Sequence, residues 1–155
     1  MIISPERKTK RYKRIYLQLQ ELVQKTDNTI ARMATISAVL YHKMDNFCWT
    51  GFYLLLKNEL IVGPYQGPLA CQMLEKNRGV CWKSINEQQS IIVPDVNKFP
   101  GHIACDPRSK SEIVIPVKNN REDIIGVLDV DSNKLNNFDE TDALHLERIA
   151  NLVYS

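Results

Sequence analysis

The stretch FCWTGFYLLL, residues 47–56, is the most informative part of the sequence for the fold. Its aromatic and apolar residues predict a buried strand. Asn58 and Glu59 then mark a turn, and LIVGPYQG at 60–67 predicts the returning strand of a hairpin. The central sheet is therefore expected to begin with these two strands.

Two helices are expected before this hairpin. Apolar residues recur at helical spacing over 8–25 and over 28–43. The break at Thr26, Asp27 and Asn28 supplies side chains that can cap the start of the second helix. The chain should therefore open with two amphipathic helices.

The rest of the chain alternates short elements with one long loop. The pattern predicts a helix over 79–88, strands over 90–93, 112–117 and 123–131, and a last helix from 138 to about 153. Residues 97–110 show no periodicity, and a long irregular loop inside a compact domain is typical of a functional loop. The order of elements predicts an α/β (α+β) domain with a mostly antiparallel central sheet.

Composition places the chain among ordinary globular domains. The 155 residues are 44% hydrophobic and 25% charged, and the net charge is +2. This near-neutral charge requires neither a nucleic acid nor a membrane as partner. No stretch approaches the ~20 apolar residues of a membrane span, and no apolar segment resembles a secretory signal. A cytoplasmic location is expected.

Basic residues are concentrated near the N-terminus, at Arg7, Lys8, Lys10, Arg11, Lys13 and Arg14. Such a short run favours a solvated helix start or a loose extension. A contact with RNA or a membrane is the alternative, but no aromatic residues are interleaved to support it. The expected organisation is a basic segment with the first helix at 1–26, followed by the main part at 27–155, in one domain overall.

The four cysteines are Cys48, Cys71, Cys81 and Cys105. No CxxC pair is present, so neither a thioredoxin motif nor a zinc ribbon is available. A reducing compartment favours reactive, metal-binding or buried thiols over permanent disulfides. Cys48 lies within the apolar strand and is expected in the core. The other three lie in loops or at element ends, which favours thiol chemistry.

Local sequence suggests how these thiols could be activated. Cys81 lies at the start of the short helix, where unpaired N–H groups favour a thiolate. His102 precedes Cys105 by three residues, so it could lower the pKa of that thiol or bind a metal. A zinc site of Cys71, Cys81, His102 and Cys105 is the weakest alternative, because only the last two form a close ligand pair.

Acidic and aromatic residues form two further sets. Asp129 and Asp131 are two apart on a predicted strand and project from one face, and Glu112 begins the neighbouring strand. Carboxylates there either meet solvent, bind an ammonium group, or include a raised-pKa carboxyl that protonates an oxygen. Trp49 and Tyr53 share a face of the first strand, as core residues or as a pocket wall for an S-methyl group.

Several motifs together resemble the free methionine-R-sulfoxide reductases, which are GAF-domain enzymes. The motifs are WTGFYLL (49–55), GPYQG (63–67), AC (70–71), RGVC (78–81), VPDV (93–96), FPGHIACD (99–106), SEIVIPV (111–117) and IIGVLDVDS (124–132). The resemblance extends from about residue 27 to residue 155, and GHIACD and GVLDVDS are its most specific parts. It implies that residues 27–155 form a GAF catalytic domain.

The resemblance implies a thiol-dependent reduction of free L-methionine-(R)-S-oxide to L-methionine. It implies that Cys105 attacks the sulfoxide sulfur and becomes a sulfenic acid, which Cys71 converts to a disulfide. Cys81 is the alternative resolving cysteine or even the attacking one. No bound cofactor is implied. Thioredoxin, or dithiothreitol in vitro, is the expected reductant, and a homodimer paired through the helices remains open.

The resemblance also implies a substrate site without a metal. Glu112, Asp129 and Asp131 match the family's acidic ligands for the amino group and the sulfoxide oxygen. Trp49 and Tyr53 match its pocket for the methyl end. A methionine within a peptide would leave the buried acids unpaired, because its nitrogen is an amide, so a free amino acid is expected.

The sequence departs from the family pattern next to Cys81. Asn77 and Trp82 occupy positions where the family usually has glycine, and Trp82 is expected to narrow the approach to Cys81 or to reposition its helix. The alternative function is a non-catalytic GAF sensor for a small ligand such as a cyclic nucleotide, because NKLNNFDE (133–140) loosely resembles the signature of such domains. A sensor has no need of three loop cysteines, so the reductase is favoured.

Overall fold

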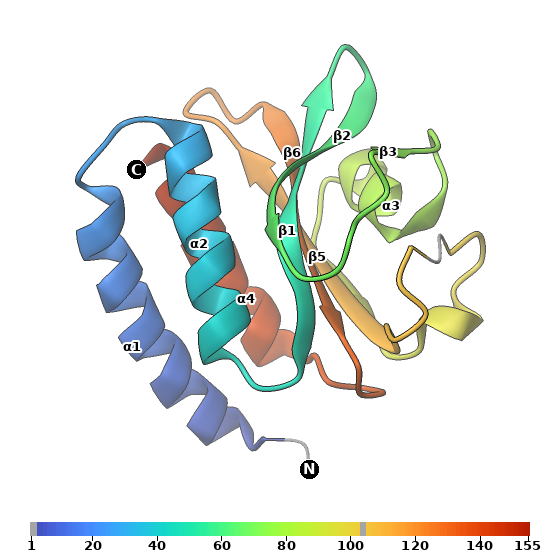
Figure 1. The fold of residues 1–155 in the computed structure, drawn as a ribbon, viewed down its shortest axis with the longest axis horizontal. Coiled ribbons are helices and arrows are strands. Elements are labelled where there is room, and N and C mark those ends of the chain that lie inside the picture. Colours follow the sequence, from blue (N-terminus) through green and yellow to red (C-terminus); the bar gives the residue numbers. More distant parts are fainter. Residues whose placement is uncertain (1–2, 103–104) are drawn as a thin grey trace.

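A six-stranded antiparallel sheet forms the centre of the computed structural model (Figure 1). The structure describes residues 3–102 and 105–155. The strands are β1 (Phe47–Leu56), β2 (Glu59–Gln66), β3 (Met73–Leu74), β4 (Ile91–Val93), β5 (Ser111–Lys118) and β6 (Ile124–Ser132). They lie side by side in the order β3-β2-β1-β6-β5-β4, and each pair is antiparallel. The expected α+β class is confirmed.

Helices cover both faces of the sheet unequally. The helices are α1 (Pro5–Val23), α2 (Thr29–Lys43), α3 (Gly79–Glu87) and α4 (Glu140–Ala150). In Figure 1, α1, α2 and α4 lie on one side of the sheet, and α3 lies on the other side with the loops around it. The apolar residues accordingly form two core clusters, one on each face. This asymmetry leaves one face of the sheet partly covered by loops.

Most predicted elements are present with boundaries shifted by a few residues. The expected cap of the second helix is confirmed, since the Asn28 side chain accepts a hydrogen bond from the Ala31 N–H at 2.9 Å. The last α-helix ends at Ala150 and continues as a 3₁₀-helix over Asn151–Tyr154. Strand β3 was not predicted, because two residues are too few to show a periodic pattern.

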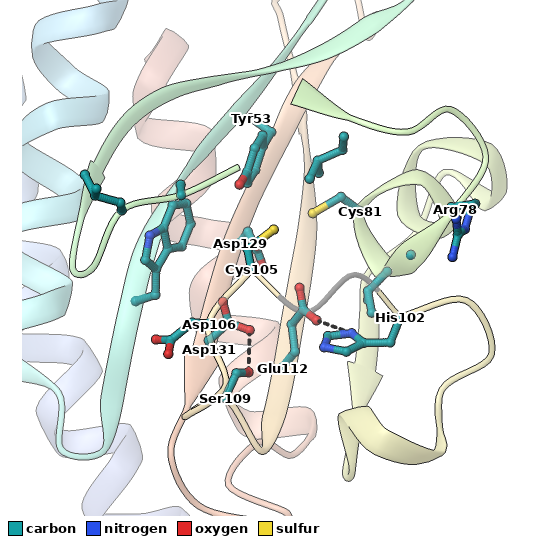
Figure 2. A pocket seen from close by; sticks show the side chains of 16 residues that line it. Tyr53, Arg78, Cys81, His102, Cys105, Asp106, Ser109, Glu112, Asp129 and Asp131 are labelled. Carbon is teal, nitrogen blue, oxygen red and sulfur yellow. Dashed lines mark hydrogen bonds and ion pairs between the residues drawn. The ribbon is translucent and has the colours of Figure 1, made fainter. Parts of the chain in front are cut away.

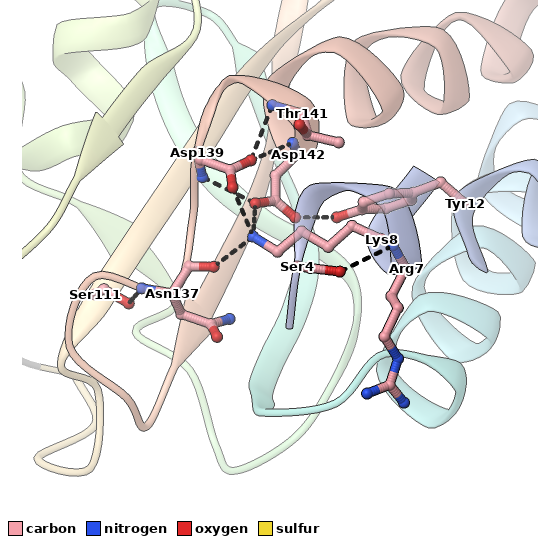
Figure 3. A network of polar contacts seen from close by, with 9 residues as sticks. All are labelled: Ser4, Arg7, Lys8, Tyr12, Ser111, Asn137, Asp139, Thr141 and Asp142. Atoms are coloured by element: carbon pink, nitrogen blue, oxygen red, sulfur yellow. Dashed lines mark hydrogen bonds and ion pairs between the residues drawn. The ribbon is translucent and has the colours of Figure 1, made fainter. Parts of the chain in front are cut away.

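The basic N-terminal segment differs from the prediction at Lys8, which is only 4% exposed. Its Nζ atom pairs with the Asp142 carboxylate and donates to the Asn137 carbonyl at 3.0 Å (Figure 3). The same carboxylate accepts from the Tyr12 hydroxyl at 2.7 Å. A solvated helix start therefore describes exposed neighbours such as Lys10, but it is wrong for Lys8. Helix α1 packs into the same core as the sheet.

No helix within residues 3–102 and 105–155 combines the length and the apolar character that crossing a membrane requires. Helix α1 has 19 residues, but charged side chains recur along it.

Candidate active site

The acidic residues lie together because of the register of three strands. Trp49 of β1 is opposite Asp131 of β6, which is opposite Glu112 of β5. Directly opposed residues in an antiparallel sheet project from the same face. Asp129, two residues before Asp131 on β6, lies opposite Gly51. The prediction that both aspartates share one face is therefore confirmed, and this face is the one covered by α3.

These side chains line a cavity with an empty volume of about 570 Å³, part of which is open to solvent (Figure 2). The sequence-predicted residues among its walls are Trp49, Tyr53, Cys81, Cys105, Glu112, Asp129 and Asp131. They come from β1, α3, β5, β6 and the loop before β5. Residues that were widely separated in the sequence therefore surround one space.

Cys71 joins this group through a disulfide with Cys105. Their Cα atoms are 5.8 Å apart, within the usual range for bonded cysteines, and 34 positions separate them in the chain. The bond uses two of the four ligands of the zinc site considered above, so that set is not available in this oxidised state. Cys48 is buried in β1 as expected, and burial, followed by the charge of Asp131, raises its pKa to about 12.

Cys81 is buried against the carboxylates. Its Sγ atom and one oxygen each of Glu112 and Asp129 lie within 4.8 Å of one another. Among the described residues, this set offers ligand atoms close enough for a cation. Burial, followed by the charge of Asp129, raises the pKa of the Cys81 thiol well above its ordinary value. The prediction that the helix start favours a thiolate here is therefore wrong.

The three carboxyl groups are strongly perturbed. Burial, followed by the charge of Asp129, raises the pKa values of Glu112 and Asp131 well above the ordinary range. Burial also raises the pKa of Asp129. The Ser109 hydroxyl donates to Asp131 at 2.9 Å, whereas the buried Oδ1 of Asp129 has no hydrogen-bond partner among the described residues. An unpartnered buried carboxyl oxygen is costly, so the cavity is suited to a cationic or donor ligand.

An aromatic wall closes one side of the cavity. The rings of Trp49 and Tyr53 are stacked with centroids 5.7 Å apart, and Tyr65 stacks on Trp49 from β2 at 5.2 Å. Gly51 lies between Trp49 and Tyr53 along β1. A Cβ atom at Gly51 would overlap the Cβ of Tyr65 and lie 2.8 Å from Cη2 of Trp49. The stacked arrangement therefore requires glycine at this position.

His102 lies beside Glu112, with 3.9 Å between Nδ1 and the carboxylate oxygen (Figure 2). Burial lowers the pKa of His102, which favours the neutral imidazole. Ile103 and Ala104, which connect it to Cys105 in the GHIACD motif, lie outside the described residues. The structure thus places His102 next to an acidic residue of the cavity.

The two departures from the family pattern are accommodated away from the cavity. Trp82 is buried in the core cluster, where its Nε1 donates to the Leu74 carbonyl at 3.3 Å. It is absent from the described residues that line the cavity, so the expected narrowing is wrong. Asn77 adopts a left-handed φ of 61°, which asparagine tolerates, and its side chain accepts from Asn86 at 3.1 Å.

Sequence reasoning missed several polar residues of the cavity, among them Ser109, Arg78 and Asp106. Ser109 holds Asp131, and Arg78 lies at the mouth just before α3, where it also pairs with Glu75 at 2.6 Å. Ser109 lies in an irregular loop, where no periodic pattern indicates a direction. Arg78 belongs to the RGVC motif, which could have identified it.

Comparisons with known proteins agree with this geometry. A family model described as GAF domain matches residues 18–154. "GAF domain-containing protein A" of Dictyostelium discoideum is 47% identical over 152 residues, covering 97% of this chain and 95% of that protein. "Free methionine-R-sulfoxide reductase" of Saccharomyces cerevisiae is 40% identical over 133 residues, covering 81% of this chain and 74% of that protein.

The fold of this chain is also similar to that of a solved structure. The free methionine-R-sulfoxide reductase from Neisseria meningitidis, in complex with its substrate, superposes with a TM-score of 0.87 and 40% identity. The match covers 92% of this chain and 85% of that one.

Proposed function

The chain belongs to the GAF-domain family of the free methionine-R-sulfoxide reductases, and from that membership we propose that it reduces free L-methionine-(R)-S-oxide to L-methionine. The observation that supports this most directly is the disulfide between Cys71 and Cys105 beside a buried acidic cavity. A thiol pair next to a cation-binding site is the combination that reduction of a small amino-acid sulfoxide requires.

The acidic side of the cavity binds the ammonium group of the substrate. Asp129 offers a buried oxygen that has no partner among the described residues, and Glu112 lies next to it. Asp131, held by Ser109, lies closest in register to Glu112 and interacts with the sulfoxide oxygen. A bound ammonium group compensates the burial of negative charge that raises the pKa values of all three acids, and it also offsets their mutual repulsion.

The two other ends of the substrate meet different walls. The methyl group packs against the stacked rings of Trp49 and Tyr53. The carboxylate group meets the start of α3, where Gly79 and Val80 line the cavity and the helix has no side-chain cap. Arg78 at the mouth adds a positive charge on the same side.

The chemistry begins with attack of the Cys105 thiolate on the sulfoxide sulfur. A carboxyl group of raised pKa, Glu112 or Asp131, donates a proton to the oxygen. The oxygen then passes to Cys105 as a sulfenic acid, and methionine leaves as the thioether. Cys71 attacks the Cys105 sulfur and releases water, so two thiols become one disulfide as one sulfoxide becomes one thioether.

Cys81 is the weaker candidate for attack, because burial and neighbouring carboxyl groups keep its thiol protonated. It remains the alternative resolving cysteine. We propose thioredoxin as the protein that reduces the disulfide, with no bound cofactor. Such recycling requires a reducing compartment, which supports a cytoplasmic location. A homodimer is compatible with these roles.

The proposal is tested by substrate selectivity. The reduced protein is incubated with dithiothreitol and free methionine-R-sulfoxide, with the free S epimer, or with a peptide-bound sulfoxide. We expect methionine only from the first. Cys105→Ser should abolish turnover, and full activity in that variant would exclude Cys105 as the nucleophile. Binding of a cyclic nucleotide without any turnover would instead favour the sensor, and tightly held stoichiometric zinc would contradict the thiol mechanism.

A further inference from the structure

The segment that bears Cys71 has no fully buried side chain. It connects β2 to β3 over residues 67–72, and its Ala70 and Cys71 are partly buried against the core cluster on the α3 face. Leu69 is 87% exposed and Met73 is 54% exposed. Side-chain packing therefore holds this segment through only the partly buried Ala70 and Cys71, and polar contacts to its backbone add to it.

Side chains of the aromatic wall bind the backbone of this segment. The Trp49 Nε1 donates to the Pro68 carbonyl at 3.1 Å, and the Tyr53 hydroxyl donates to the Cys71 carbonyl at 3.3 Å. Burial, followed by the charge of Asp129, raises the pKa of Tyr53, so this hydroxyl stays protonated and remains a donor. The second bond ends on the resolving cysteine itself.

Gly67 allows the close approach on which the first of these bonds depends. Its φ is +124°, and a Cβ atom there would lie 2.9 Å from the Cys48 carbonyl oxygen and 3.0 Å from Trp49 Cδ1. The chain therefore passes directly over the indole ring before it reaches Cys71. The two residues assigned to the substrate's methyl group thus also hold the Cys71 segment.

Resolution depends on how often the two sulfur atoms meet. Once Cys105 is a sulfenic acid, the Cys71 thiolate must reach its sulfur, and the rate follows the effective concentration that the segment allows. A hydrogen bond to the Cys71 backbone restricts that segment on the side facing the cavity. The effect applies after methionine has formed.

We propose that Tyr53 is a positioning residue for the resolving step. Its hydroxyl holds the Cys71 backbone where the Cys71 sulfur can reach Cys105. This inference rests on the proposed function and extends it to the second half of the cycle. The ring of Tyr53 packs against the methyl group of the substrate, whereas its hydroxyl positions Cys71 for disulfide formation. The two roles separate when only the oxygen is removed.

The test compares Tyr53→Phe with the wild type in a single turnover. Reduced protein is mixed with one equivalent of free methionine-R-sulfoxide and quenched with dimedone and N-ethylmaleimide. We expect the rate of disulfide formation, measured relative to the rate of methionine formation in the same variant, to fall about three- to tenfold, the effect of one net hydrogen bond. Mass spectrometry should show dimedone-labelled Cys105 accumulating after methionine has formed.

Tyr65→Phe is the matched control, because Tyr65 also stacks on Trp49 but does not belong to the described lining of the cavity. It should resolve at the wild-type rate. An unchanged disulfide rate in Tyr53→Phe would refute the proposal. A raised KM with normal resolution would also refute it, by assigning the hydroxyl to substrate binding.

Hydrogen peroxide separates this inference from the proposed function. Peroxide oxidises the Cys105 thiolate to the sulfenic acid and leaves water, with no methionine sulfoxide involved. Disulfide closure should then be slower in Tyr53→Phe even if the sulfoxide is not a substrate. A defect with peroxide but no methionine from the wild type would retain this inference and remove the proposed function.

Discussion

Glu112 of β5 pairs directly with Asp131 of β6, so two carboxyl groups of raised pKa project side by side into the same cavity. In water such a pair would be ionised at neutral pH. Here burial makes ionisation costly, and a cationic ligand compensates that cost. These buried acids are therefore expected to lower the free energy of unfolding of the free protein and to stabilise a bound cationic ligand.

Glu112→Gln should stabilise the protein at neutral pH. The folded protein binds a proton at Glu112 more tightly than the unfolded chain, so the free energy of unfolding falls as pH rises from the ordinary carboxyl pKa towards the raised one. We expect a gain of about 1–3 kcal/mol at pH values above the ordinary carboxyl pKa and none below it. Thermal unfolding at about pH 8 and about pH 4 measures both values; equal gains at the two pH values would contradict the explanation.

The KM for free methionine-R-sulfoxide should rise as the pH is lowered. Burial raises the pKa of Asp129 and of both neighbouring acids, so acidification removes the negative charge that binds the ammonium group. The rise approaches about tenfold per pH unit for each proton taken up on binding-site acids. Asp129→Asn should increase KM and flatten this dependence. An unchanged pH profile in the variant would exclude Asp129 as the ammonium ligand.

Gly51→Ala should disturb the aromatic wall. The added methyl group overlaps Tyr65 and lies 2.8 Å from Trp49, so the indole must move. We expect a loss of about 1–3 kcal/mol in unfolding free energy together with a higher KM. Gly63→Ala on β2 is the control, since its Cβ would approach Leu54 no closer than 3.1 Å. Equal losses of unfolding free energy and equal KM values in both variants would exclude steric overlap at Gly51 as the cause.

Lys8→Met should destabilise the fold without altering the chemistry. Removing the ammonium group leaves the Asp142 carboxylate buried beside Tyr12 without its counter-ion. Breaking such a pair costs about 3–5 kcal/mol. Denaturant unfolding measures the loss, and the exposed Lys10→Met provides the control with a change of less than about 0.5 kcal/mol. Adding Asp142→Asn should recover part of the loss; no recovery would place the defect elsewhere.

Much of the fold could be predicted because local patterns determine it. Amphipathic spacing identified α1 and α2, and the aromatic run identified β1. The alternation in GVLDVDS placed Asp129 and Asp131 on one face before any register was known. These predictions depend only on neighbours within a few residues.

The remaining features depend on contacts between distant segments. Burial raises the pKa of Cys81 most, followed by the charge of Asp129 on a strand that comes later in the chain, and together they outweigh the nearby helix start. Lys8 meets Asp142 across 134 positions of sequence, which no local pattern reveals. The pairing of Cys71 with Cys105 was expected from the family resemblance, since their spacing alone gives no indication of it.

The burial of Lys8 has a consequence for any fragment of this protein that begins after it. The region that matches the GAF family model begins at residue 18, within α1 and after Lys8. A fragment trimmed to that region would retain every group proposed to contact the sulfoxide, yet it would lack the cation that neutralises the start of α4. The region that the family model matches is thus shorter than the region that packs into the core.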